Sequence, residues 1–159
     1  MFALESILYD IASLFLLPAL ALILASVVYA LFALGAFLVE AIQRRRPGWR
    51  SSLADHQART GAASDDLELL ILKKLEGLRI VSRSAPMLGL VATMIPMGPA
   101  LLALGRGDGA SIGEDLVVAF SGVTLALIAA SIAHYVLTVK RRWLLQDLRA
   151  VERSLAGAD

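Results

Sequence analysis

The sequence predicts an all-α integral membrane protein with three transmembrane helices. The 159-residue chain is 58% hydrophobic and only 18% charged, whereas about a quarter of the residues in soluble domains are charged. Three blocks contain no Asp, Glu, Lys or Arg, and they are Ile11–Val39, Ser84–Gly105 and Leu116–Val139. They hold about 29, 22 and 24 residues, and each exceeds the roughly 20 residues needed to cross a bilayer.

The distribution of basic residues predicts the orientation of these spans. Nine of the 15 Lys and Arg residues lie in segment 43–83 and five in the tail 140–159, whereas only Arg106 lies between the second and third blocks. Basic residues that flank spans stay on the cytoplasmic side. We therefore expect a multi-pass protein of the cytoplasmic (inner) membrane, with its N-terminus outside and its C-terminus inside.

These two patterns divide the chain into six segments. They are an outer N-terminus with the first span at 1–42, a cytoplasmic segment at 43–83, the second span at 84–105, a short outer loop at 106–115, the third span at 116–139 and a cytoplasmic tail at 140–159. The first helix is expected to end at the basic run Arg44–Arg46, a topology anchor, and the helix-breaking pair Pro47-Gly48.

Two amphipathic helices are predicted to extend the spans into the cytoplasm. The first begins at Ser64, a good N-cap that two acidic residues follow. Its apolar stripe comprises Leu67, Ile71, Leu75 and Leu78, and the tail carries a second stripe at Leu144, Leu148, Val151 and Leu155. No Gly or Pro lies between Val123 and Ala156, so the third span and the tail are expected to form one helix. The stripes are expected to pack together, and such faces also favour oligomers.

The second span carries an unusual number of helix breakers for a membrane helix. Between Ser84 and Leu104 they are Pro86, Gly89, Pro96, Gly98 and Pro99. Helical spacing places Pro86, Gly89 and Pro96 on the same face as Thr93. Proline frees backbone carbonyls, which lipid cannot satisfy, so this face is expected to be enclosed by other helices or to line a hydrated path. A kinked helix at a tight helix–helix contact and a functional path are both open on this pattern.

The third span carries a stripe of hydroxyl groups along one face. Its members fall within an arc of about 100° on a helical wheel, and they are Ser121, Thr124, Ser131, Tyr135 and Thr138. Gly122 and several alanines form a separate surface that suits close packing. Each hydroxyl can bond back to its own helix or line a hydrated path, and the alignment of five favours the path.

Ionisable side chains are almost absent from the spans. His134 is the one titratable candidate, and it lies near the cytoplasmic end, where snorkelling is an alternative role. A proton or sodium path normally needs a carboxylate in mid-membrane. If the protein conducts ions, another polypeptide must supply that carboxylate.

The second and third spans resemble those of the MotA/TolQ/ExbB proton-channel family. The resemblance rests on the run "APMLGL" with a threonine three residues further on, the Gly/Pro-rich stretch after it, the short outer loop, and "AFSGVTLAL" on the third span. The resemblance covers roughly 81–148 and extends to the order of spans. It implies a homo-oligomeric ring, commonly a pentamer, around single-span partners like MotB, TolR or ExbD that carry a membrane aspartate. Thr93 matches the second-span threonine that faces the partner, whereas Ala119 stands where the family has a third-span threonine.

The resemblance therefore implies a subunit that couples the flow of protons, or of sodium, to mechanical work or to energised transport. The alternatives are an oligomeric membrane scaffold and a subunit of a small transporter. No nucleophile–base pair, metal-ligand cluster or phosphate-binding loop is visible, so we expect neither an enzyme nor a metal or other cofactor. The net charge of +1 gives no indication of a nucleic-acid partner.

Overall fold

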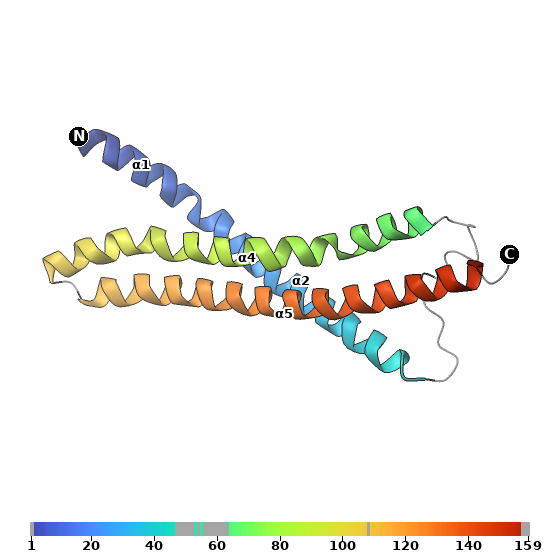
Figure 1. The fold of residues 1–159 in the computed structure, drawn as a ribbon. Helices are drawn as coiled ribbons and strands as arrows, with labels where there is room; N and C mark the ends of the chain where they lie inside the picture. The colour runs from blue at the N-terminus through green and yellow to red at the C-terminus, as the bar shows by residue number, and fades with distance from the viewer. Residues whose placement is uncertain (1, 47–52, 54, 56–63, 108, 157–159) are drawn as a thin grey trace. The chain divides into compact units, whose positions relative to one another are not determined.

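The computed structural model is all-helical over the residues that it describes, which are 2–46, 53, 55, 64–107 and 109–156. Its helices are α1 (Phe2–Leu14), α2 (Leu16–Gln43), α4 (Ser64–Arg106) and α5 (Gly109–Ala156) (Figure 1). Three stretches are long and apolar enough to cross a membrane, and they are Ile7–Gln43, Asp65–Gly105 and Ile112–Ser154. The prediction of an all-α chain with three candidate transmembrane helices is thus confirmed.

The first span is interrupted once, at Phe15 between α1 and α2. The Phe15 amide donates to the Ala12 carbonyl at 3.0 Å, a tighter turn than that of the flanking helices. Pro18 explains the interruption, because a proline has no amide hydrogen and its ring crowds the carbonyl four residues earlier. That carbonyl belongs to Leu14, the last residue of α1.

The other two spans belong to much longer helices. α4 begins at Ser64, as predicted, and continues for 43 residues through Pro86, Pro96 and Pro99. α5 has 48 residues, which confirms that the third span and the tail form one helix. At a rise of 1.5 Å per residue the two helices are roughly 65 and 72 Å long, about twice the hydrocarbon thickness of a bilayer.

The connection between α4 and α5 is shorter than the loop predicted at 106–115. α4 ends at Arg106 and α5 begins at Gly109. Gly107 has a φ of 73°, and its amide donates to the Leu104 carbonyl at 3.1 Å. One glycine in the left-handed region is enough to end a helix, so few residues reverse the chain. The turn predicted at Pro47-Gly48 lies outside the described residues.

The chain forms two compact units, the first made of Met1–Leu31 with Val81–Ile132 and the second of Phe32–Ile80 with Ala133–Asp159. The first unit has a core cluster of Ile23 from α2, Ala92 from α4 and Ala126 from α5. Leu20 and Leu88 pack against this cluster. Two of its three buried members are alanines, and such small side chains let helix backbones approach closely.

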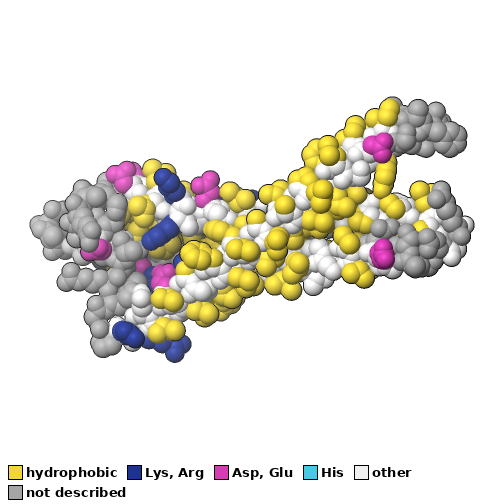
Figure 2. Space-filling view, turned by 180° about the vertical axis from the view of Figure 1, so that it is seen from behind, with side chains coloured by type: hydrophobic (Ala, Val, Ile, Leu, Met, Phe, Trp, Pro, Cys, Tyr) yellow, Lys and Arg dark blue, Asp and Glu magenta, His cyan; other side chains and the backbone are white. Residues whose placement is uncertain are grey.

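The core of the second unit contains the two predicted apolar stripes. Leu67, Ile71, Leu75 and Leu78 of α4 are buried, as are Leu144, Leu148 and Val151 of α5. Both stripes are buried within the same unit, as the prediction that they pack together requires. Outside the cores, hydrophobic side chains cover much of the face drawn in Figure 2.

Candidate functional site

Within the first unit, α4 and α5 approach closely at two glycines. A Cβ atom added to Gly89 would lie 2.9 Å from the Ala126 Cβ, closer than real Cβ atoms come. One added to Gly122 would lie 3.3 Å from the Ala92 Cβ. Because position 89 faces 126 and position 92 faces 122, the two helices run antiparallel. Gly89 and Gly122 therefore both lie in the close contact between α4 and α5.

The face of α4 that carries Pro86, Gly89 and Pro96 is covered at Gly89 by α5 of the same chain. Pro96 is also buried, whereas Pro86 and Pro99 are half-buried. A second polypeptide is thus not needed to enclose Gly89. At Gly89 the covering helix thus belongs to the same chain, in line with the expectation that this face is enclosed by other helices.

Thr93 lies at the rim of this packed face. Its side chain is half-buried, and its hydroxyl donates to the Leu90 carbonyl at 2.7 Å. Met97, one turn further along α4, is 48% exposed. Thr93 is therefore accessible to a molecule that approaches α4 from the side, although its own donor is satisfied within the helix.

The hydroxyl stripe of α5 faces away from the core of the first unit. Ser121, Thr124 and Ser131 are exposed, whereas Gly122 and Ala126 on the other side of the helix are buried. The Ser121 hydroxyl donates to the Val117 carbonyl at 2.6 Å, and the Ser131 hydroxyl donates to the Leu127 carbonyl at 2.8 Å.

Thr124 differs from its neighbours in the stripe. Its hydroxyl has no hydrogen-bond partner among the residues that the structure describes. No hydrogen bond joins Thr93 to the α5 hydroxyls within the same described ranges. Within the described residues, each of the bonded hydroxyls of Thr93, Ser121 and Ser131 therefore donates to its own helix and not across the α4–α5 contact.

The remaining candidates, His134 and Tyr135, belong to the second unit. The Tyr135 ring lies edge-on to Phe37 of α2, with 6.1 Å between ring centroids, and Phe37 stacks on Trp143 at 5.2 Å. Tyr135 is still 61% exposed. Aromatic packing therefore fixes the ring of Tyr135, and His134 is an exposed residue on the same helix.

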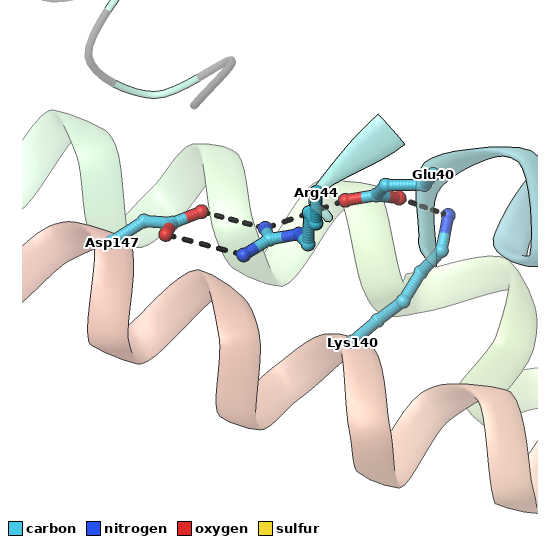
Figure 3. A network of polar contacts seen from close by, with 4 residues as sticks. All are labelled: Glu40, Arg44, Lys140 and Asp147. Carbon is cyan, nitrogen blue, oxygen red and sulfur yellow. Dashed lines mark hydrogen bonds and ion pairs between the residues drawn. The ribbon is translucent and has the colours of Figure 1, made fainter. Parts of the chain in front are cut away.

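An ion-pair network in the second unit was not predicted from the sequence. Arg44, after the end of α2, donates to both carboxylate oxygens of Asp147 on α5, at 2.7 and 3.3 Å (Figure 3). Glu40 accepts from Arg44 at 3.4 Å and pairs with Lys140 at 3.1 Å. The Arg44 and Asp147 side chains are 16% and 14% exposed, so the bidentate pair is largely shielded from solvent. Arg44 also lies 4.7 Å above the Trp143 ring.

The sequence did contain a partial signal for this network. Glu40 and Arg44 are four residues apart, and Lys140 and Asp147 are seven apart, so each pair lies on one face of its helix. The missing information was that α2 runs beside α5 at this point. Arg44 is therefore a structural residue in addition to its predicted role as a topology anchor.

Among the described residues, no group of three His, Asp or Glu side chains is placed to hold a metal ion. Comparison of the chain with protein-family models, with curated proteins and with solved structures finds no match. The resemblance to the MotA/TolQ/ExbB family therefore stays a prediction, and it rests on the motif and on the order of the spans.

Proposed function

We propose that the chain is an ion-channel subunit of a MotA/TolQ/ExbB-like motor in the cytoplasmic membrane. The observation that carries the proposal is the stripe of Ser121, Thr124 and Ser131, which is exposed on the first unit and faces away from its core. Hydroxyl groups at membrane depth are best placed against protein or water, because lipid offers them no partners. A second copy of the chain or a hydrated path beside α5 meets this need.

The lack of a carboxylate in the three apolar blocks supports a complex of two different polypeptides. The three apolar blocks contain no Asp or Glu, yet a protonatable group in mid-membrane is the usual means of carrying a proton. A single-span partner with one membrane aspartate supplies this group. The membrane potential contributes about 2.3 kcal/mol per charge per 100 mV, so each ion that crosses can drive a modest conformational step.

A ring would let the Thr93 hydroxyl and the α5 hydroxyls of different copies line one path. These residues belong to different helices, and no hydrogen bond joins them within the described part of one chain. In a ring, α4 of one copy and α5 of the next copy line the same space. Several copies, five in the family that the chain resembles, then surround the partner helices and complete the path.

A second candidate function is that of an oligomeric membrane scaffold without an ion path. The hydroxyls of Thr93, Ser121 and Ser131 each donate to a carbonyl in their own helix. Such bonds satisfy the donors without water. In that case the stripe is a contact surface between copies of the chain and conducts nothing.

The mass of the native complex tests the proposal. The full chain, extracted from its own membrane in a mild detergent, is expected to carry a second, single-span polypeptide with a membrane Asp. The mass should correspond to several 17.0 kDa subunits per two partner chains. A lone monomer contradicts the motor and the scaffold alike, and an oligomer without any second polypeptide favours the scaffold.

Substitution of Thr93 by valine tests the path itself. Valine keeps the shape of the side chain and removes its hydroxyl, so the complex should assemble normally but lose most of its ion flux in liposomes under an imposed potential. Ser26→Ala is the matched control, because Ser26 also bonds back to its own helix, at 2.7 Å to the Leu22 carbonyl, and lies in the first span. Unchanged flux in Thr93→Val removes Thr93 from the path.

A further inference from the structure

The second unit contains a groove of about 730 Å³ between α4 and α5. Lys73 and Arg79 contribute from α4, and Arg141 and Arg142 contribute from α5. Glu76 is the one carboxylate among the residues that line the groove. Four cationic groups thus face one acid in a single concave surface.

The cations of the groove differ from those of the ion-pair network. Lys140 is paired with a carboxylate, as is Arg44. No ion pair involves Lys73, Arg141 or Arg142 within the described part of the chain. Within the described residues, these three cations therefore keep a positive charge that no ion pair neutralises.

The walls of the groove also offer apolar surface. Leu75 is buried and Leu137 is half-buried, whereas Leu72 and Leu145 are exposed, at 59% and 42%. On α5 the lining begins inside the apolar block that ends at Val139 and continues into the basic cluster. One side of the ligand is thus expected to be apolar, and the other to be anionic.

We propose that this groove binds an anionic phospholipid of the leaflet that the basic residues face. The phosphate lies among Lys73, Arg141 and Arg142, and an acyl chain follows Leu137 and Leu145. Arginine binds phosphate oxygens in bidentate fashion, and basic pockets between helices at the membrane surface suit lipid head groups. The proposal requires only that the chain spans a bilayer, so it stands independently of the ion-channel function.

Native mass spectrometry of the full chain tests the site. The protein in detergent is mixed with phosphatidylglycerol, or with phosphatidylcholine of the same acyl chains, and the bound lipid is counted. The wild type is expected to retain phosphatidylglycerol in clear preference. Lys73→Gln/Arg142→Gln, which removes one cation from each wall, should weaken its binding about tenfold or more, since each basic group near a lipid surface contributes about fivefold.

Arg45→Gln/Arg46→Gln is the matched control, because it removes two exposed cations that do not line the groove. It should keep the preference of the wild type. Equal loss in both double variants overturns the site and indicates general surface attraction. Inorganic phosphate that displaces the lipid at millimolar concentration shows a free-anion site instead, and a wild type without preference overturns the proposal before any variant is made.

Discussion

At the scale of single residues, the packing of the first unit depends on positions without room for a side chain. The face of the second span that carries Gly89 was expected to allow a tight helix contact, but only the structure shows that Ala126 is the residue that Gly89 meets. The helical period of a sequence pattern shows which residues share one face of a helix. It does not report which helix covers that face, so a tight helix contact and a functional path both remained open from the sequence.

Gly89→Ala is expected to lower the free energy of unfolding in detergent by about 1–3 kcal/mol, because the new methyl group overpacks the contact with Ala126. Gly89→Ala/Ala126→Gly removes the opposing methyl group and should restore most of the loss. Gly35→Ala is the control, since nothing lies within 4 Å of its added Cβ, and it should be neutral or stabilising by up to about 1 kcal/mol. A Gly89→Ala protein as stable as the Gly35→Ala protein would contradict this account of the contact.

At the scale of elements, the network of Arg44, Asp147, Glu40 and Lys140 fastens the end of α2 to α5. Asp147→Asn leaves the Arg44 guanidinium largely shielded beside a neutral partner. We expect a loss of about 1–3 kcal/mol in the free energy of unfolding, measured by thermal or denaturant titration in detergent.

Two further variants of the chain test whether Arg44 and Asp147 interact directly. Arg44→Gln/Asp147→Asn should lose less than the sum of its single substitutions, because the two side chains interact directly. Glu68→Gln, at an exposed position of α4 outside the network, should have almost no effect. Additive losses in the double variant would show that the pair contributes nothing of its own.

The elements themselves were largely predictable, for physical reasons. The stripes of α4 and α5 repeat with the helical period over several turns, and their burial followed that period. The break at Phe15 was missed because its cause is a single residue, Pro18, inside a long apolar block. The short turn at Gly107 was missed because Gly, Ser and Asp suggest a loop, whereas α5 begins already at Gly109.

At the scale of the whole molecule, the exposed surface of the single chain indicates what must surround it in the membrane. Large apolar side chains such as Leu17, Phe32 and Leu101 are exposed, at 77%, 76% and 64%. Lipid suits these residues, because their side chains are as apolar as the acyl chains. Lipid suits the exposed Thr124 hydroxyl least, because it has no hydrogen-bond partner among the described residues, and this contrast is the basis of the proposed ring.

The contrast can be measured directly, because the chain contains no cysteine and accepts single labels. Spin labels at Thr124→Cys and Ser131→Cys are compared with one at Leu24→Cys on α2, a 60% exposed apolar position, in the native assembly within a bilayer. We expect the Thr124 and Ser131 labels to be less accessible to oxygen, which concentrates in lipid, and more accessible to a water-soluble nickel chelate than the Leu24 label. If all three labels show the same high oxygen accessibility, the stripe faces acyl chains and the proposed ring is wrong.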